Sequence, residues 1–496
     1  MGQRICIIGS GFAGLSAACF LAGQGFEVDV FEALDKPGGR ASLWEEKGFK
    51  FDMGPSWYWM PDVFERFFQQ FNRQPSDYYQ LVRLDPSYRI FWKETAVDIP
   101  AGAVALGELF ERWEPGSSRA LQLYLREAAR KYEIAMQKFV FKPGLSWLEF
   151  LDADIIRAIG KLDLLSSIQR HVGCYFKDER IRQIMQFPVL FLGSLPQDTP
   201  ALYSLMNYAD IELGTWYPIG GMYRVVEAMY ALARSLGARF HFQQAVEQII
   251  VKQSKATGVL TKTGFQPADV VLATADYHHV EQSLLPEPYR QYRPSYWLSR
   301  RLSPSAMLYY LGIDRKLTGL RHHNLFFDTD FDRHARHIYA EPSWPEEPLF
   351  YLSVPSITDP SVAPPGQENL FVLIPLAPGL DGDTPRLRED YLQQVLNRIA
   401  WHTGQHISSD PVYQKTFGPD DFVNRYHAFR GNAYGLANTL RQTAVWKPRM
   451  RSRKVENLFF AGQLTVPGPG VPPAIISGEI AARIITKYLH QLLPVI

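Results

Sequence analysis

Cysteine is scarce in this chain of 496 residues, which contains only Cys6, Cys19 and Cys174. Three thiols at these separations match no metal-binding spacing and allow no disulfide framework, so we expect neither a metal site nor a disulfide-stapled fold. An excess of one charge is also lacking, because 52 Lys and Arg residues stand against 51 Asp and Glu residues. Without a basic excess, we expect no nucleic-acid partner.

Long uninterrupted apolar runs are lacking as well. The two most apolar stretches, 184–195 and 461–478, are broken by proline and glycine, so we predict no transmembrane helix. The apolar run at 5–8 is short and leads directly into glycine, which is typical of a strand and not of a secretory signal. Together with the few cysteines, these absences predict a cytoplasmic protein.

A glycine motif near the start is the most informative feature present. The apolar run at 5–8 is followed by Gly9, Gly11 and Gly14, and Glu32 closes a second apolar run. This is the strand–turn–helix–strand pattern in which a helix N-terminus binds the diphosphate of a dinucleotide and an acid binds a ribose. The motif alone does not separate FAD from NAD. We expect cofactor contacts from Gly9, Gly11, Phe12, Ala13, Gly14 and Glu32.

A second glycine element follows at Gly38, Gly39 and Arg40. A glycine doublet lets the backbone approach a ligand closely, and the arginine adds a bidentate donor for phosphate oxygens. Gly54 and Pro55 come next and are expected beside the flavin ring. These residues narrow the cofactor to FAD.

The far end of the chain carries another cofactor element. A strand-like run at 457–461 leads into Gly462 and Gln463, and a loop with Gly470, Val471 and Pro472 precedes a helix expected at 474–489. The N-terminus of that helix would stabilise the anion of a reduced flavin. Cofactor elements at opposite ends imply that the two termini meet in one domain.

Taken together, these motifs resemble the bacterial-type phytoene desaturase family of FAD-dependent carotenoid desaturases, in the amine oxidase and protoporphyrinogen oxidase-like group of flavoproteins. The similarity extends through 216–249, 268–280, 308–327, 351–366, 429–452 and 457–479. It implies that the backbone at Val246 pairs with the adenine. One departure is the loop at 465–470, which reads Thr-Val-Pro-Gly-Pro-Gly where many members have Thr-His-Pro-Gly-Ala-Gly.

We therefore predict an α/β fold with two discontinuous domains. A Rossmann-like FAD-binding domain is expected from 1–61, 215–290 and 416–496. A mixed-sheet substrate domain is expected from 62–214 and 291–415, with a helical insert at about 100–165 that faces a membrane. The glycines at 220–221 open a further expected helix at 225–236.

The family resemblance implies desaturation of an apolar carotenoid by hydride transfer to FAD, with oxygen or quinone as the electron acceptor. The first candidate is conversion of 15-cis-phytoene to lycopene or an intermediate in carotenoid biosynthesis. The alternatives are a later carotenoid desaturase, an isomerase or a saturase on the same scaffold, or a flavin-carrying carotenoid-binding protein without turnover. An amine oxidase is disfavoured, because the C-terminal loop has no cysteine to link the cofactor.

No catalytic residue can be assigned from the sequence, since an allylic cation loses its proton to a weak base. Adjacent histidines in a strand are expected to point apart, which argues against a paired-histidine metal site. The polar groups inside family-like segments are His278, His279, His322, His323, Asp198 and Arg430.

A carotenoid dwells in the bilayer, so we expect peripheral attachment to a membrane surface. The two candidate segments are the basic helix at 119–142 and the stretch at 296–302, and packing on the protein core is the alternative for both. Aromatic residues at 57–59, 64–71 and 78–79, with Phe191, are candidates for a substrate tunnel or for the core.

Overall fold

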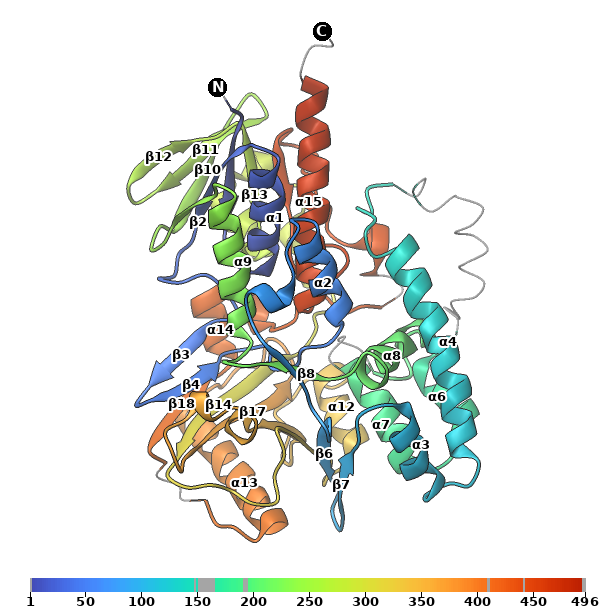
Figure 1. The fold of residues 1–496 in the computed structure, drawn as a ribbon. Coiled ribbons are helices and arrows are strands. Elements are labelled where there is room, and N and C mark those ends of the chain that lie inside the picture. Colours follow the sequence, from blue (N-terminus) through green and yellow to red (C-terminus); the bar gives the residue numbers. More distant parts are fainter. Residues whose placement is uncertain are drawn as a thin grey trace.

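A parallel sheet of five strands is assembled from both ends and the middle of the chain (Figure 1). In spatial order its strands are β19 (Leu458–Phe460), β13 (Val270–Ala273), β1 (Arg4–Ile8), β2 (Glu27–Phe31) and β9 (Arg239–His241). The computed structural model describes residues 2–146, 149, 166–190, 195–407, 411–439 and 442–492. Because β1 pairs in parallel with both β2 and β13, the sheet has the Rossmann-like order that the glycine motif predicts.

Helices and a small sheet cover the two faces of this parallel sheet. The helices are α1 (Phe12–Gly23), α9 (Tyr223–Ser235) and α15 (Val471–Leu492). The small antiparallel sheet consists of β10 (Val246–Lys252), β11 (Lys255–Thr261) and β12 (Gly264–Pro267). Side chains of β1 alternate between the faces, so Ile5 and Ile7 pack with the helices while Cys6 and Ile8 pack with the small sheet.

A second, mixed sheet of seven strands lies beside the first domain (Figure 1). Its strands, in spatial order, are β18 (Tyr413–Phe417), β14 (Ser305–Ile313), β17 (Glu368–Leu376), β16 (Phe350–Ser353), β15 (His323–Phe326), β6 (Tyr88–Phe91) and β7 (Ala96–Ile99). Helix α13 (Pro385–Thr403) covers one face, where Met307, Tyr309 and Leu311 of β14 pack. The alternate residue Leu308 lies on the opposite face, in a separate core.

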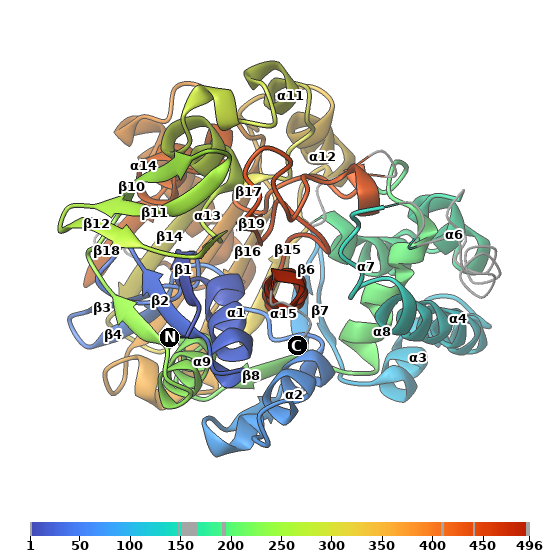
Figure 2. The same ribbon diagram turned by 90° about the horizontal axis from the view of Figure 1, so that it is seen from above.

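The helices described in the region 103–211 form a unit at the far side of the mixed sheet from α13 (Figures 1 and 2). They are α3 (Ala103–Glu111), α4 (Ser117–Lys138), α6 (Ile168–Tyr175), α7 (Glu179–Leu190) and α8 (Leu205–Ile211). The helix expected at 119–142 ends at Lys138, shortly before the Pro143–Gly144 break in the sequence. Part of the expected insert at 100–165, namely 147–148 and 150–165, lies outside the described residues, as do Phe191 and part of the stretch at 184–195.

Shorter elements connect the two sheets. They are β3 (Leu43–Glu46), β4 (Phe49–Asp52), α2 (Pro61–Gln69), β5 (Leu81–Arg83), β8 (Trp216–Pro218), α10 (Tyr277–His279), α11 (Pro294–Leu298), α12 (Phe331–Tyr339) and α14 (Pro419–Tyr426). Two expected domain boundaries fall inside elements. The one at 61/62 lies in α2, and the one at 415/416 lies in β18, whose hydrogen bonds to β14 hold it in the mixed sheet.

Candidate functional site

A cavity of about 310 Å³ lies between the parallel and the mixed sheet, at the carboxyl ends of β1, β2 and β13. This edge is where open α/β sheets bind their ligands. Gly14 and Pro472, both expected at the cofactor, do not line the cavity. The expected residues that do line it are Gly9, Gly11, Phe12, Ala13, Glu32, Gly38, Gly39, Arg40, Gly54, Pro55, Val246, Gly462, Gln463, Gly470 and Val471.

The three glycines of the N-terminal motif have different neighbours. A side chain at Gly14 would place its Cβ 2.2 Å from the carbonyl oxygen of Gly9, so glycine is required for α1 to pack on the end of β1. A Cβ at Gly11 would meet nothing nearer than 4.0 Å, and Gly11 lies on the cavity wall. Gly14 therefore serves the fold, while the open space at Gly11 is available to a ligand.

Glu32 connects the ends of the first two strands. Its Oε2 accepts hydrogen bonds from the Ser10 backbone N–H at 2.8 Å and the Ser10 hydroxyl at 2.7 Å, and its Oε1 accepts from the Leu34 N–H at 3.0 Å. The carboxylate is buried on the cavity wall. Because a carboxylate has about four acceptor positions, Glu32 retains one for a ribose hydroxyl.

Arg40 lies on the wall of the cavity, and its side chain is partly buried. Its Nη2 lies 3.9 Å from Oδ2 of Asp276, and its Nε has no hydrogen-bond partner among the described residues. Burial raises the pKa of Asp276 to about 6, although Arg40 opposes that rise. A guanidinium with an unpaired buried N–H, on the same cavity wall as the open space at Gly11, fits a bound phosphate. The residues present therefore fit the diphosphate of FAD.

Several cavity residues were not identified in the sequence. Thr274, Ala275 and Asp276 follow β13 directly, and the position after a parallel strand was a usable signal. Tyr426 and Tyr434 come from the chain around α14, which packs on the mixed sheet. No local pattern marks these two tyrosines, because only the packing of one domain on the other brings them to the cavity.

An apolar pocket of about 50 Å³ adjoins the cofactor cavity, and Leu373 and Tyr434 line both. Helix α12 and strands β15 and β16 supply most of its wall. The other lining residues are Phe187, Pro304, Leu325, Phe327, Phe331, His334, Ala335, Ile338, Tyr339, Leu349, Phe350, Tyr351 and Pro375. His334 is satisfied within this wall by the Leu349 N–H and the Pro375 carbonyl, both at 2.9 Å. The pocket suits a hydrocarbon that offers no hydrogen bonds.

The expectation that His322 and His323 point apart is wrong. Their rings meet at a centroid distance of 4.5 Å, because His322 lies in a bend before β15 and not in the strand. Nδ1 of His322 lies 2.8 Å from the Thr358 hydroxyl, and Nδ1 of His323 lies 2.7 Å from the Tyr351 hydroxyl. Burial lowers the pKa of His322 to about 3, so both rings are neutral in the folded protein.

The other polar candidates lie at different places. His279 lines the cofactor cavity and stacks on His427, and burial lowers its pKa to about 4. His278 packs against Phe429 with ring centroids 4.0 Å apart. Asp198 and Arg430 line an outer cavity of about 200 Å³, which shares Ile338 and Tyr339 of α12 with the apolar pocket. That outer cavity contains Asp198, Arg300, Arg301, Ile338, Tyr339 and Arg430.

The apolar faces of the two candidate membrane segments are largely used inside the protein. Leu121, Tyr124 and Ala128 of α4 are buried in the core of the helical unit. In α11, Trp297 is fully buried, whereas the side chain of Leu298 is 66% exposed. Among the described residues, no helix has the length and apolar character needed to cross a membrane.

The aromatic clusters of the sequence are mostly core. Tyr58, Phe64, Phe67 and Phe68 are buried against the helices that cover the parallel sheet. Trp57 differs, because it stacks on the ring of His323 at a centroid distance of 4.1 Å. Of the two readings of 64–71, core packing is the one that the buried residues Phe64, Phe67 and Phe68 of α2 follow, and the apolar pocket is built by other residues.

Relatives of known activity match nearly the whole chain. A carotenoid 3,4-desaturase of Haloarcula japonica is 45% identical over 97% of this chain and 98% of its own length. A zeta-carotene-forming phytoene desaturase of Myxococcus xanthus is 33% identical over 99% of this chain and 95% of its own. A 4,4'-diapophytoene desaturase of Staphylococcus aureus is 32% identical over 99% of this chain and 100% of its own length.

Solved structures share the fold at lower sequence identity. A redesigned putrescine oxidase superposes with a TM-score of 0.63 at 15% identity, covering 98% of this chain and 99% of its own. A protein described as a putative protoporphyrinogen oxidase from Exiguobacterium superposes with a TM-score of 0.62 at 14% identity, covering 99% of this chain and 100% of its own. The model of the flavin-containing amine oxidoreductase family matches residues 12–486. The chain belongs to this family, in the group of the carotenoid desaturases, and is an FAD-dependent oxidoreductase.

Proposed function

We propose that this protein desaturates the C3–C4 bond near the end of a carotenoid that is already conjugated, such as lycopene. The observation that carries the proposal is the apolar pocket that shares Leu373 and Tyr434 with the cofactor cavity. The choice of bond rests on the 45% identity with a carotenoid 3,4-desaturase, against 33% with a phytoene desaturase.

The chemistry suits such a site. In lycopene, C4 is allylic to the polyene, so removal of a hydride from C4 leaves a cation that the whole conjugated chain stabilises. Loss of a proton from C3 then completes the double bond. Bound FAD supplies the two-electron acceptor for the hydride.

Residues of the chain hold the reactants and exclude water. Arg40 and the backbone at Gly11 and Gly39 would bind the diphosphate, and Glu32 the ribose. Leu308 and Leu373 form the mixed-sheet side of the cofactor cavity, so a polyene in the apolar pocket would lie across apolar side chains. A dry pocket protects the cationic intermediate from attack by water.

Desaturation of 15-cis-phytoene is the second candidate, favoured by the similarity to the Myxococcus xanthus phytoene desaturase along nearly the whole chain. Chromatography of products from lycopene and from 15-cis-phytoene, each supplied in liposomes with FAD, separates the candidates. A longer-wavelength didehydro product from lycopene, with phytoene unchanged, supports 3,4-desaturation. Coloured products from phytoene alone support the second candidate, and the absence of any product from either substrate contradicts both.

We further propose that the protein docks on a membrane surface to take up its substrate, with a quinone or oxygen as the final electron acceptor. The outer cavity next to the apolar pocket bears Arg300, Arg301 and Arg430, and the exposed Leu298 lies close by in sequence. Such basic and apolar groups favour an anionic bilayer. Flotation with anionic liposomes tests this, with Leu298→Ser expected to weaken flotation. Full turnover of liposomal carotenoid by protein that never floats would refute docking.

A further inference from the structure

One row of side chains crosses the mixed sheet from the cofactor cavity into the apolar pocket. Leu308 of β14 pairs with Leu373 of β17, which pairs with Tyr351 of β16, which pairs with Leu325 of β15. Leu308 and Leu373 line the cofactor cavity, and Leu373, Tyr351 and Leu325 line the apolar pocket. Since neighbouring strands lie about 5 Å apart, the backbone of Tyr351 lies one strand beyond Leu373, the last residue of this row at the cofactor cavity.

Tyr351 lines the apolar pocket, and its hydroxyl belongs to a chain of hydrogen bonds with Ser56 and His323. It donates to Oγ of Ser56 at 2.9 Å and lies 2.7 Å from Nδ1 of His323. His323 is fully buried and stacks on Trp57, and its Nε2 has no hydrogen-bond partner among the described residues. The imidazole with its proton on Nδ1 therefore donates to the tyrosine oxygen, and Trp57 holds the ring in place.

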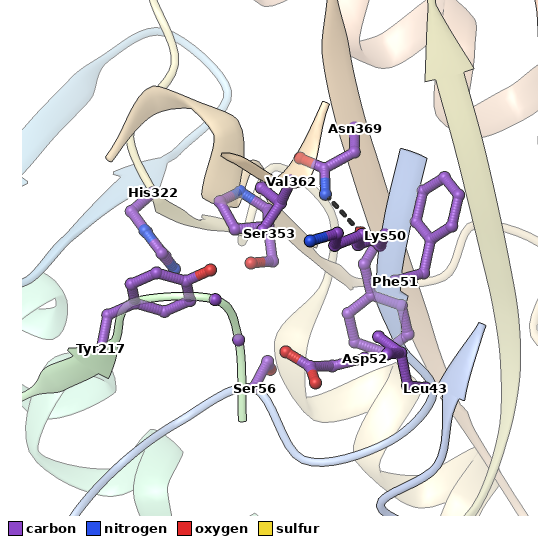
Figure 3. Close-up of a pocket in the computed structure, with 14 residues that line it drawn as sticks. Leu43, Lys50, Phe51, Asp52, Ser56, Tyr217, His322, Ser353, Val362 and Asn369 are labelled. Atoms are coloured by element: carbon purple, nitrogen blue, oxygen red, sulfur yellow. Dashed lines mark hydrogen bonds between the residues drawn. The ribbon is translucent and has the colours of Figure 1, made fainter. Parts of the chain in front are cut away.

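Ser56 opens into a separate polar cavity of about 20 Å³ (Figure 3). Asp52, His322 and Ser353 line the same cavity, as labelled in Figure 3. A cavity of this volume with polar side chains in its wall has room for one water molecule. The Asp52 carboxylate accepts hydrogen bonds from the backbone N–H groups of Met222 and Tyr223, at 2.7 and 2.9 Å. Burial raises the pKa of Asp52 to about 7, which makes it a proton acceptor near neutrality.

We propose that Tyr351 is a catalytic residue that takes the substrate proton and passes one on through Ser56 to the polar cavity and Asp52. This rests on the proposed desaturation, in which the hydride has left the substrate before the proton does. The C–H bond breaks and its electron pair becomes the new C=C bond. The proton joins the Tyr351 oxygen while the tyrosine's own proton moves to Ser56, and the serine proton moves through a cavity water to the carboxylate of Asp52. His323 is a positioning residue that orients the tyrosine.

Tyr351→Phe tests the proposal, because it removes the hydroxyl and keeps the ring. In anaerobic single-turnover experiments stopped by rapid quenching, we expect the rate of product formation to fall by about 100-fold. The KM for the carotenoid should stay within a factor of two of the original. The solvent deuterium isotope effect on that rate should disappear, because the exchangeable hydroxyl protons no longer move. Tyr309→Phe is the matched control. It lies on the α13 face of the same sheet and loses one buried hydrogen bond, to the Arg388 carbonyl.

Ser56→Ala provides a second test that spares the tyrosine ring. It should slow product formation and remove the isotope effect, and Ser56→Thr should restore both. Rates and isotope effects within a factor of two of the original in folded, FAD-loaded Tyr351→Phe or Ser56→Ala protein would overturn the proposal. If the unaltered protein forms no product from any carotenoid, the proposed function itself fails, so the two failures are distinguishable.

Discussion

Arg66 of α2 and Glu479 of α15 form a bidentate ion pair, with N–O distances of 2.6 and 2.8 Å. The guanidinium also lies over the ring of Phe141, 4.0 Å from its centroid. Glu479 is largely buried, while Arg66 is more exposed. The pair joins the chain after the N-terminal βαβ unit to the last helix, so it secures the packing of α15 on the cofactor domain.

Glu479→Gln should reduce the stability of the protein. A bidentate arginine–carboxylate pair with one buried partner is stronger than a fully exposed ion pair. Its loss should lower the free energy of unfolding by about 1 kcal/mol. The thermal midpoint of the FAD-free protein, measured by circular dichroism, should fall by roughly 2 °C. Arg483→Gln is the control, because Arg483 is half-exposed, lies 4.0 Å from the same carboxylate and donates a close hydrogen bond to the Phe141 carbonyl instead. An equal fall in both variants would contradict a special role for Arg66.

Arg40→Met should weaken FAD binding by roughly 10- to 100-fold, since one charge-assisted phosphate contact contributes about 1.5–3 kcal/mol. The FAD affinity of Arg40→Lys should lie between that of the original protein and that of Arg40→Met, because an ammonium cannot bind phosphate oxygens in bidentate fashion. Titration of the apoprotein with FAD, followed by quenching of flavin fluorescence, measures the affinity. An unchanged Kd in Arg40→Met would place the diphosphate elsewhere.

Gly11→Ala and Gly14→Ala should fail in different ways. The Cβ at Gly11 meets open space in the protein, so the FAD-free fold should keep its thermal midpoint while FAD affinity drops. The Cβ at Gly14 collides with the Gly9 carbonyl, so Gly14→Ala should lower the midpoint by several degrees or prevent folding. Equal loss of stability in the two variants would contradict this division.

Asp52→Asn should change the pH dependence of stability in one direction. The pKa of Asp52 is about 7 when folded, above its ordinary value of 3.8, so the folded protein binds the extra proton between these limits. This carboxyl therefore contributes most stability at low pH and loses it as pH rises toward 7. Thermal midpoints of both proteins are measured from pH 4 to 8. The midpoint of the variant minus that of the original protein should rise as pH increases to 7 and stay constant above it. A constant difference would show an ordinary carboxyl.

Local chemistry explains which parts of the site could be predicted. Gly9, Glu32 and Arg40 follow strands or turns that can be recognised within a few residues, and they line one cavity. Gly14 matches the motif equally well but serves packing, which only the distance to the Gly9 oxygen reveals. Tyr434 reaches the cavity by contact between domains, so no spacing in the chain marks it.

Strand alternation was less reliable near strand ends. The rule that neighbouring side chains point apart holds along β14, where Leu308 and Tyr309 lie in different cores. It fails for His322 and His323, because β15 begins only at the second of them. The same limit applies to the boundary at 415/416, since an edge strand such as β18 is assigned by its hydrogen bonds and not by its composition.

Strand β19 pairs with β13, and α15 packs on α1, so the last segments of the chain complete a domain that the first segments begin. During synthesis, the apolar surface of α1 that packs on α15 therefore stays uncovered until α15 has left the ribosome. The parallel sheet and the helix layer beside α1 are therefore complete only after the segments of β19 and α15 have been synthesised. A chain shortened before residue 471 would leave the surface of α1 that packs on α15 exposed to solvent.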